Sequence, residues 1–492
     1  MEKFRTISYA AFECPAPVEV TVRTASPVKT FNVSPHSAGL RAGADASGLS
    51  FRLDRPRQLV VTVNGGEKLL LFADPPDPAA PKPGDPGVIN VLETGVDPTG
   101  GRLETARLQA AIDRVAAAKG VLYFPAGVYL TGSLSLKSDL TLYLAEGARL
   151  LGSDDPGDYP VDPGFDEANI RWDPELWLKL PGVDVSYRRL LLIDEATNVR
   201  VAGRGTIEGN GKALLGGATG REIAAVGSKT KPHIPGPKPV NIHLILIRRS
   251  SGVVFEDVTL LDSPMYNAHV LASDHVTFRN VKMVSDQTVV NTDGIDPDSS
   301  RDVLIERCFF LCADDCVSVK TSGQSRVRGD AERITVRHCV FLTRTSAVKL
   351  GTEIYVGRQR DIVFEDNDVL ETGRGINISS EGHYGYERIR FTGFRIERFD
   401  WHRLQFPVHI HVEPRHPDGA AGWIHDVLLQ DLKAEVEPPA RSRIAGFSAE
   451  HDVRGVRFVN YTVAGRVRLD AADAGVQIGP YVSDVTFTRT ER

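Results

Sequence analysis

Length, composition and charge set the first limits on this protein. The chain has 492 residues, of which 41% are hydrophobic and 25% charged, with a formal net charge of -6. These values are ordinary for a folded protein, and they argue against a nucleic-acid partner because dedicated nucleic-acid binders are usually basic. The sequence has no apolar segment of membrane-spanning length and no apolar stretch of signal-peptide length near its N-terminus. We therefore expect a cytoplasmic protein without a membrane partner, although a secreted protein whose leader had been removed would look the same.

Residues 1–82 have the pattern of a small β-sandwich. Short runs of alternating apolar and polar residues are separated by Pro, Gly and Ser turns, as in VEVTVRT, LSFRL, QLVVTVNG and KLLLFA. The proline-rich stretch DPPDPAAPKPGDPG follows and predicts an extended linker that ends over residues 83–87. We expect an accessory domain over residues 1–82 and a larger second domain over residues 88–492.

The second domain begins with a predicted helix. The segment TGGRLETARLQAAIDRVAAAKG has apolar residues at helical spacing, a Thr or Glu at its start and a Gly at its end. From about residue 122 onward the pattern changes to short strands. The helix is therefore expected to cap the open end of the strand structure that follows.

A unit of two strands joined by a polar turn recurs along the rest of the chain. Copies begin at Asn198, Gly252, His275, Asp302, Arg333, Asp361, Arg388, His425 and Gly455. Most neighbouring copies start roughly 23 to 31 residues apart, a period typical of solenoids. One such unit cannot bury its own apolar residues, so successive coils must stack, which predicts an all-β, right-handed parallel β-helix. Its interior should contain Val303, Ile305, Ile334, Val336, Ile362 and Phe364.

The cysteines do not suggest disulfides. They form an odd, sparse set, namely Cys14, Cys308, Cys312, Cys316 and Cys339. Three of them are close enough in sequence to suggest a metal site, but Cys308 and Cys339 occupy the same position of successive copies, where small apolar residues stack inside a coil. We expect reduced thiols in the core, with no metal and no cofactor.

The segment VVNTDGIDPDSSRDVLIERCFFLCADDCVSVK contains three candidate catalytic carboxylates. Asp293 ends one coil, and Asp314 and Asp315 stand at the matching point of the next. Residues one coil apart are neighbours at strand spacing, so the three side chains should converge. Carboxylates this close resist joint ionisation, which places a protonated acid beside ionised bases. Inverting glycoside hydrolysis requires that arrangement.

Most of residues 88–400 resemble glycoside hydrolase family 28, the polygalacturonases and related enzymes. The resemblance rests on FPAGVYLTGSLSLKSDLTLYLAEGARLLGS, GRGTIEGNG, NTDGIDPDSSRDVLIERC and ADDCVSVK. It implies an inverting hydrolase whose partner is an oligo- or polysaccharide, pectin-related or from another plant or bacterial glycan. By motif, Asp314 resembles the general acid, and Asp293 with Asp315 resembles the base that activates water. The N-terminal sandwich is similar to modules that precede exo-acting bacterial members.

Two motifs usual in that family are replaced. Ser346, in TRTSAVKLGTE, stands where a Gly-His-Gly motif has its His. Asn377 and Ser379, in RGINISS, stand where an Arg-Ile-Lys motif holds a substrate carboxylate with two cations. Loss of the cations predicts weak or no activity on polygalacturonate and favours a neutral sugar, or a uronic acid held in another way.

Further polar residues are candidates for contact with substrate. The candidate substrate-binding residues are Asn291, Lys320, Lys349, Glu353, Asn377 and His383. Lys349 shares an outward column with Asn377, and a structural salt bridge is an equally good interpretation of Lys349 and Glu353. His383 is a candidate replacement for the missing family His.

Two other polar pairs are interpreted as structural. His409 and His411 share a strand face, but no third ligand completes a metal site. Asp296 and Asp298, in GIDPDSS, are expected to fix a turn by accepting hydrogen bonds from backbone amides.

Two long insertions interrupt the repeats, at about residues 155–190 and 211–240. They are rich in Pro and Gly and carry Trp172, Trp177, Tyr187 and His233. Long loops on a repeat scaffold gather on one face and carry binding function, so we expect them to close one end of a groove into a pocket. A pocket favours release of small units from a chain end.

Two alternatives stay open. A polysaccharide lyase on the same scaffold would need calcium held by acids and a basic residue to abstract a proton, and no convincing Arg or Lys base lies beside these acids in the sequence. A non-catalytic carbohydrate-binding β-helix would have no reason to cluster three acids, and such grooves are usually lined with aromatic residues.

Overall fold

The computed structural model describes residues 2–4, 7–15, 17–45, 47–66, 68–162, 184–214, 240–287, 289, 291–400, 405–414 and 419–490. The chain divides into two compact units, Met1–Ala80 and Pro81–Arg492. Within the described ranges, no helix has the length and hydrophobicity needed to cross a membrane.

The N-terminal unit consists of two sheets around one small core. The larger sheet has the order β1 (Glu2–Phe4), β2 (Ile7–Glu13), β8 (Lys68–Asp74), β7 (Arg57–Val63) and β4 (Phe31–Ser34). The smaller sheet has the order β3 (Val18–Arg23), β6 (Gly48–Leu53) and β5 (Ala42–Ala44). Leu49 and Phe51 of β6 are buried in the same cluster as Leu59 and Val61 of β7, so the two sheets bury their apolar faces against each other.

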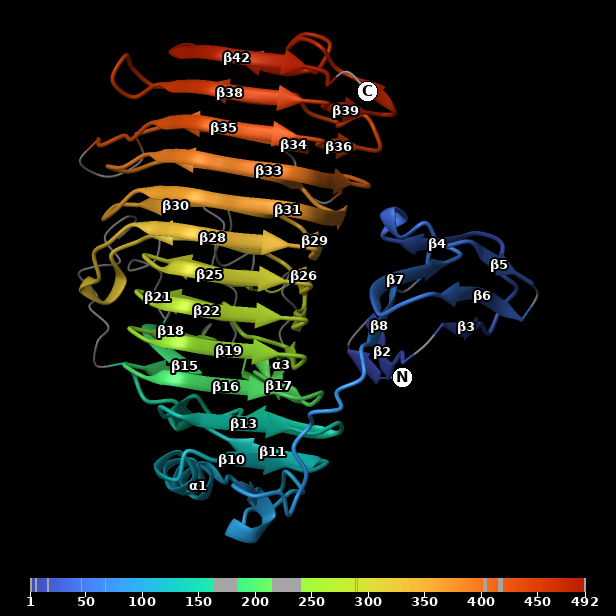
Figure 1. Ribbon diagram of the computed structural model, residues 1–492, viewed down its shortest axis with the longest axis vertical. Coiled ribbons are helices and arrows are strands. Elements are labelled where there is room, and N and C mark those ends of the chain that lie inside the picture. Colours follow the sequence, from blue (N-terminus) through green and yellow to red (C-terminus); the bar gives the residue numbers. More distant parts are fainter. Residues whose placement is uncertain are drawn as a thin grey trace. The chain divides into compact units, whose positions relative to one another are not determined.

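The second unit is a right-handed parallel β-helix, as predicted, with up to three strands in each coil (Figure 1). The first strands pair in the order β10 (Val121–Phe124), β13 (Leu140–Leu144), β16 (Thr197–Ala202), β19 (Ser251–Glu256), β22 (Asp274–Arg279), β25 (Arg301–Glu306), β28 (Ala331–Arg337), β31 (Gln359–Glu371), β33 (Tyr386–Ile396), β35 (Ile424–Gln430), β38 (Val453–Val459) and β42 (Val482–Thr488). The second strands are β11 (Gly127–Thr131), β14 (Ala148–Gly152), β17 (Thr206–Glu208), β20 (Thr259–Leu261), β23 (Lys282–Val284), β26 (Phe309–Cys312), β29 (Val340–Thr343), β36 (Lys433–Ala434) and β39 (Thr462–Val463).

The third strands form a separate 11-stranded sheet, which carries the candidate site. Its order is β12 (Leu134–Leu136), β15 (Asp184–Asp194), β18 (Val240–Arg248), β21 (Ala268–Leu271), β24 (Ile295–Asp298), β27 (Val317–Thr321), β30 (Ser346–Ile354), β32 (Arg374–Ser380), β34 (Phe406–Val412), β37 (Ser442–Ala445) and β41 (Val476–Ile478). The short strands β9 (Val88–Asn90) and β40 (Arg466–Val467) pair with β10 and β39.

The copies found in the sequence coincide with a backbone bend that each coil needs. Left-handed φ angles between 52° and 56° occur at Asn198, His275, Asp302, Arg333, Asp361 and Arg388. Gly252 and Gly455 occupy the same position with φ of 67° and 71°. The copy assigned to His425 is shifted by one residue, because Asp426 has the left-handed φ of 52°. A further copy that the sequence analysis missed is β42, in which Asp484 has a φ of 54°.

The interior of the β-helix is the predicted apolar stack. Val303 lies beside Ile334, which lies beside Ile362, and all three are buried in one core cluster. Ile305, Val336 and Phe364 form the next column and are also buried. The predicted cap is α1 (Thr105–Ala117), which lies at one end of the coils in Figure 1 and buries its apolar face in the same cluster. A short helix, α3 (Gly211–Leu214), follows β17.

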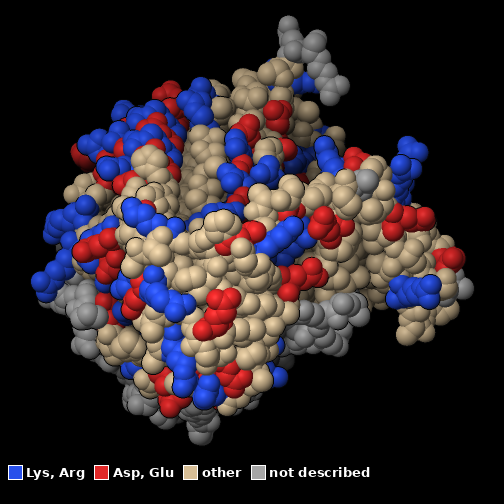
Figure 2. Space-filling model, turned by 60° about the horizontal axis from the view of Figure 1, so that its bottom comes forward, with Lys and Arg blue, Asp and Glu red and all other residues tan. Residues whose placement is uncertain are grey.

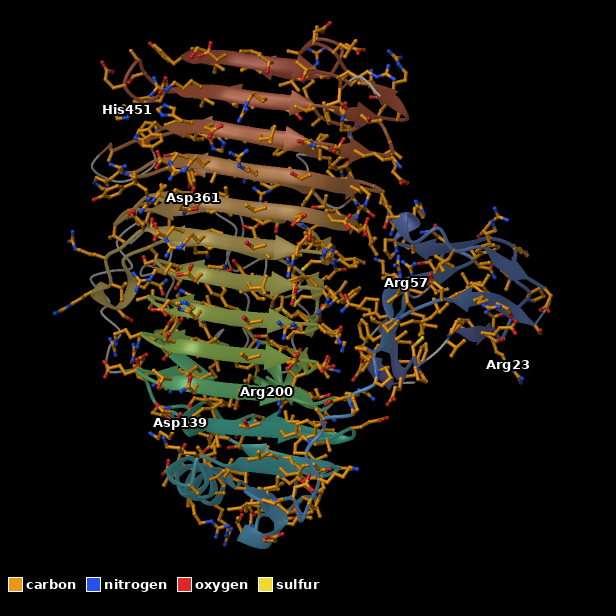
Figure 3. All side chains as sticks on the ribbon, viewed as in Figure 1. Arg23, Arg57, Asp139, Arg200, Asp361 and His451 are labelled. Atoms are coloured by element: carbon orange, nitrogen blue, oxygen red, sulfur yellow. The ribbon has the colours of Figure 1, made fainter. Side chains whose placement is uncertain are left out.

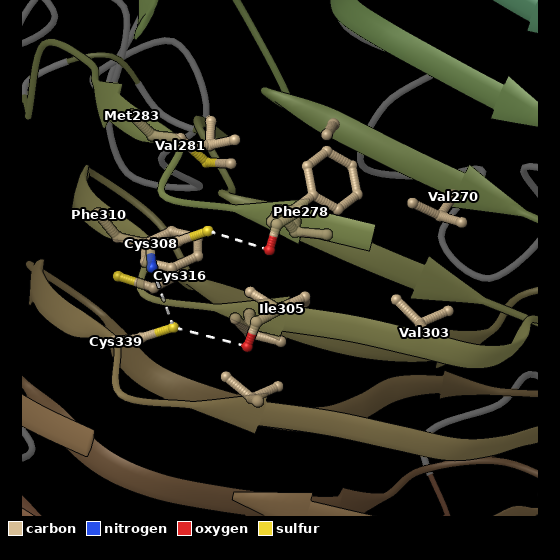
Figure 4. Close-up of a cluster of buried hydrophobic side chains, with 14 of the residues drawn as sticks. Val270, Phe278, Val281, Met283, Val303, Ile305, Cys308, Phe310, Cys316 and Cys339 are labelled. Atoms are coloured by element: carbon tan, nitrogen blue, oxygen red, sulfur yellow. Dashed lines mark hydrogen bonds between the residues drawn. The ribbon is translucent and has the colours of Figure 1, made fainter. Parts of the chain in front are cut away.

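The five cysteines are buried and are not joined in disulfides, as predicted for core thiols. Figure 4 shows Cys308 and Cys339 stacked in neighbouring coils, where the Cys308 amide donates to Cys339 Sγ at 3.4 Å. Each thiol also donates to a backbone carbonyl, Cys308 to Phe278 at 3.5 Å and Cys339 to Ile305 at 3.7 Å. These weak bonds satisfy the thiols inside the core.

Candidate active site

The three predicted carboxylates lie just before two neighbouring strands of the 11-stranded sheet. Asp293 precedes β24, and Asp314 and Asp315 precede β27. The Gly294 amide donates to the Asp315 carbonyl at 3.0 Å, which holds the two coils together at this point. The register of the parallel strands therefore brings Asp293 level with Asp315, as the one-coil spacing predicted.

Asp314 and Asp315 share one hydroxyl donor but differ in their other partners. Thr345 Oγ1 lies 3.1 Å from Asp314 Oδ1 and 3.0 Å from Asp315 Oδ1. Asp315 also accepts from the Ser346 amide at 3.0 Å, and its Oδ1 lies 3.5 Å from Arg374 Nη2. Asp314 Oδ1 accepts from the Asp315 amide at 2.9 Å, so each carboxylate has an amide donor, and Arg374 lies at ion-pair distance from Asp315.

The surroundings shift the pKa values of the two carboxyl groups in opposite directions. Burial and the neighbouring charge of Asp315 raise the pKa of Asp314. Burial also disfavours the ionised form of Asp315, but Lys349, Arg374 and the Ser346 amide hold its pKa below its ordinary value. The surroundings therefore favour the protonated form of Asp314 and the ionised form of Asp315.

A buried lysine connects the remaining carboxylates of the site. Lys320 Nζ lies 3.0 Å from Asp296 Oδ2 and 3.5 Å from Asp293 Oδ2. Glu353 Oε2 is 3.9 Å away, and the ammonium also donates to Tyr266 Oη at 3.0 Å. Burial favours loss of the lysine proton, but the surrounding acids raise the pKa of Lys320 well above its ordinary value, so this group stays cationic.

The turn role predicted for Asp296 is wrong. Asp296 belongs to β24, its side chain is 0% exposed, and it faces Lys320 rather than a backbone amide. Its Oδ1 has no hydrogen-bond partner among the described residues. Burial, opposed by Lys320 and His269, raises the pKa of Asp296 to about 7. Burial and the charge of Asp296 in turn raise the pKa of Asp293 well above its ordinary range, because the two acids resist joint ionisation.

Asp298 does accept a backbone hydrogen bond, as predicted, but within a larger buried network. Its Oδ1 accepts from the Ser322 amide at 2.9 Å, and the Ser322 hydroxyl donates to Oδ2. His269 Nε2 lies 3.2 Å from Asp298 Oδ2, and Tyr187 Oη lies 2.5 Å from His269 Nδ1. Burial opposes ionisation of Asp298, but the bonds from His269 and Ser322 lower its pKa. Asp298 is therefore a paired anion behind the site.

The other candidate substrate residues differ in exposure. Lys349 lies beside Asn377 in the register, as the shared column predicted. Asn377 is buried, whereas Lys349 and Asn291 are half-buried, the latter two residues before Asp293. His383 is exposed in the turn after β32, so this candidate lies at the surface.

Sequence analysis missed Thr345 and Arg374, although both contact the carboxylate pair. Thr345 directly precedes Ser346, and Arg374 lies beside Ser346 in the register. Arg374 also opens the altered motif RGINISS, so its signal was present in the sequence. The sequence did not show that stacking of the coils places Arg374, at the start of RGINISS, beside Ser346 of the preceding altered motif.

The predicted walls of the groove lie largely beyond the described residues. Trp172, Trp177 and His233 fall outside them. Tyr187 was assigned to a wall, but it is a buried residue of β15. Among the described residues, no group of three or more His, Cys, Asp or Glu side chains is placed to hold a metal ion.

Comparison with known proteins points to one family. The model of Glycosyl hydrolases family 28 matches residues 183–410, a segment that contains all three predicted carboxylates. A probable polygalacturonase from Vitis vinifera is 30% identical over 287 residues, or 57% of this chain and 54% of the relative. A polygalacturonase from Ralstonia solanacearum is 26% identical over 403 residues, or 71% of this chain and 68% of the relative. Residues 183–410 therefore resemble glycosyl hydrolases family 28 at the distance of a divergent relative.

The match to this family agrees with the fold. The exopolygalacturonase from Thermotoga maritima has a TM-score of 0.57 and 21% sequence identity, over 83% of this chain and 93% of that chain. At that identity the likeness concerns the fold alone. The chain spans about half the length of the Vitis vinifera relative, so the relatives' activities are carried over only as a proposal.

Ser346 stands where the family's histidine is expected. Ser346 bonds Asp315 through its backbone amide, while its Oγ is buried and has no partner among the described residues. A serine hydroxyl cannot become cationic, so the charge that a histidine could add is supplied near Asp315 by Lys349 and Arg374.

Proposed function

We propose that this protein hydrolyses glycosidic bonds of an oligo- or polysaccharide with inversion at the anomeric carbon. The observation that carries the proposal is the divergence within one pair, since the pKa of Asp314 is raised while that of Asp315 is lowered. An inverting enzyme needs one carboxylic acid to protonate the leaving oxygen and one carboxylate to take a proton from water. Relatives named as polygalacturonases support a pectin-related glycan as the broad substrate class.

In this mechanism the proton of Asp314 moves to the glycosidic oxygen as its bond to the anomeric carbon breaks. A water molecule forms the new bond on the opposite face of the sugar and gives its proton to Asp315, the ionised member of the pair. Asp293 belongs to the same water-activating side, where Lys320 at 3.5 Å opposes the rise in pKa that burial and Asp296 cause. Asp314 ends ionised and Asp315 protonated, and proton exchange with solvent restores both.

The configuration of the first product tests this mechanism. A panel of neutral and acidic plant and bacterial oligosaccharides is incubated with the protein, and new reducing ends are followed by proton NMR before they mutarotate. We expect the anomer opposite to that of the bond cleaved, and retention would contradict the inverting mechanism. New ultraviolet absorbance from an unsaturated sugar would indicate a lyase. An intact panel after long incubation would indicate carbohydrate binding without catalysis.

The end from which cleavage proceeds is a separate part of the proposal. We expect release of small units from a chain end, because the long insertions suit a closed pocket. Small products should then appear before the viscosity of a polymeric substrate falls. A rapid early fall in viscosity would contradict exo action without affecting the acid and base assignments.

A further inference from the structure

Beyond the catalytic pair, three polar side chains on adjacent coils carry buried atoms without hydrogen-bond partners. Asn377 of β32 lies beside His409 of β34 in the register. Asn377 is only 3% exposed, yet neither its Oδ1 nor the buried Nε2 of His409 has a partner among the described residues. Ser346 Oγ, in the coil before, is also buried and without one. Unpartnered buried polar atoms are costly, so a cluster of them points to a ligand that completes their bonds.

Asn377 and His409 point to the outward face of the 11-stranded sheet. Successive side chains of a strand point to opposite faces, and the residues on either side of Asn377 and His409 are in the core. Those core residues are Ile376, Ile378, Val408 and Ile410. Lys349 continues the column from Asn377 towards the catalytic pair, where its charge lowers the pKa of Asp315. A sugar chain lying along this column would reach both regions.

The three unpartnered atoms belong to uncharged groups, while Lys349 lies beside Asn377 and Arg443 beside His409 in the register. Burial and the neighbouring His411 lower the pKa of His409 to about 3, so its imidazole is neutral at neutral pH. Asn377 offers an amide oxygen and Ser346 a hydroxyl. Hydroxyl groups of a sugar can donate to or accept from each of these groups.

The Glu381 carboxylate lies next to Ser379, the position where the family resemblance implies a cation. Ser379, at the position of the expected Lys, donates its hydroxyl to Glu381 Oε1 at 2.9 Å. Glu381 is buried, and His411 Nε2 lies 3.8 Å from the same oxygen. A second carboxylate brought to this position by a uronic acid would meet a like charge in a poorly solvated place, which opposes its binding.

We propose that the sugar unit bound beside Asn377 and His409 is a neutral pyranose recognised through its hydroxyl groups, and that Glu381 excludes a uronic acid from this position. The inference rests on the proposed function, because it names the substrate class of the same groove. In the bound state Asn377 Oδ1 accepts from one sugar hydroxyl, and His409 Nε2 bonds another according to its tautomer.

Matched ligands test the charge preference directly. The full chain with Asp314→Asn is titrated calorimetrically with oligogalacturonides and with the same oligosaccharides after reduction of their carboxyl groups, which keeps length and linkage. Neutral arabinan and xylan oligosaccharides complete the set. We expect the best neutral ligand to bind at least tenfold more tightly than the oligogalacturonide.

Further substitutions in the Asp314→Asn protein show which residues cause the charge preference. Glu381→Gln should strengthen oligogalacturonide binding about tenfold and leave neutral ligands nearly unchanged, because only the acidic ligand loses a like charge. Asn377→Ala should weaken neutral ligands about tenfold. Asn460→Ala is the matched control, since Asn460 is a half-buried residue of a remote coil bend that bonds Asp431 at 2.8 Å. It should leave all affinities unchanged.

Each result decides the inference. Equal or tighter binding of the oligogalacturonide overturns it, as does failure of every neutral ligand to bind. If the wild type binds neutral ligands but cleaves nothing, the proposed function fails while this inference stands. If the wild type cleaves polygalacturonate as readily as any neutral substrate, the proposed function stands and this inference fails.

Discussion

Two outward faces of the same β-helix differ in how their charged side chains are paired and buried. Along the first strands, an aspartate of one coil pairs with an arginine of the next, as in Asp302 with Arg333 at 2.7 Å, Asp361 with Arg388 at 2.6 Å and Asp426 with Arg457 at 2.6 Å. Asp361 is labelled on this side of the coils in Figure 3, and Figure 2 shows positive and negative side chains intermixed over the visible surface. Each of these three aspartates has a partner and contact with water.

The outward face of the 11-stranded sheet is different. Asp293, Asp296 and Glu353 approach one ammonium, that of Lys320, and all four side chains are largely buried. Paired, solvated charges cost a fold little, whereas buried groups of one sign cost stability. The comparison teaches that the location of unbalanced buried charge, rather than the amount of charge, marks the functional face. Four substitutions, from the largest expected effect to the smallest, test that difference.

Lys320→Met should have the largest effect on stability. The change leaves Asp293 and Asp296 buried without the ammonium that they share, so the free energy of unfolding should fall by about 3–5 kcal/mol. Urea denaturation at neutral pH measures it. A loss as small as that of a surface ion pair would mean that the two faces do not differ in the way described.

Asp314→Asn should reduce turnover by about 100-fold or more, because the amide keeps the shape of the side chain but has no proton to transfer. Steady-state rates on the best substrate of the panel measure the loss. A substrate whose leaving group needs no protonation should restore the activity of this variant. Asp315→Asn serves as the comparison, since it should stay inactive on both substrates, and the reverse pattern would exchange the acid and base assignments.

Asp296→Asn tests the buried acid through pH. The pKa of Asp296, about 7 in the folded protein, lies above that of an unfolded aspartate, so folding takes up a proton between about pH 4 and pH 7. The stability that this protonation supplies is present at low pH and is lost as the pH rises. The unfolding free energy of wild type relative to the variant should therefore fall with rising pH, by at most about 1.4 kcal/mol per pH unit. Urea denaturation across this interval measures it, and a difference independent of pH would contradict the assignment.

Arg457→Met should have the smallest effect. Arg457 and Asp426 are both about half exposed, and such pairs contribute roughly 0.2–1 kcal/mol to stability. The methionine keeps the apolar stem of the side chain, and activity should not change. Because salt screens exposed pairs, the wild type and the variant should become equally stable at high ionic strength. A loss of several kcal/mol would show that this face is not the tolerant one.

The repeat, the apolar stack and the positions of the main carboxylates could be predicted from the sequence alone. Alternation along strands dictates which residues enter the core, and the bend of each coil selects a residue in the left-handed region, so both recur at a visible period. Asp293 and the Asp314–Asp315 pair could be found because one coil of sequence corresponds to one step between neighbouring strands. The copy at β42 was missed because it is the last one and stands beside few apolar residues.

Which charges share a partner became clear only from the folded chain. GIDPDSS has the composition of a turn, yet Asp296 lies in a strand because pairing of β24 with β21 and β27 overrides local preference. Lys320 lies near three acids, and Ser379 bonds Glu381 where a cation was expected. Both contacts depend on which side chains of neighbouring coils face each other. Sequence spacing gives the coil of each residue, but desolvation and pairing depend on every neighbour packed around it, and these come from segments far apart in the chain.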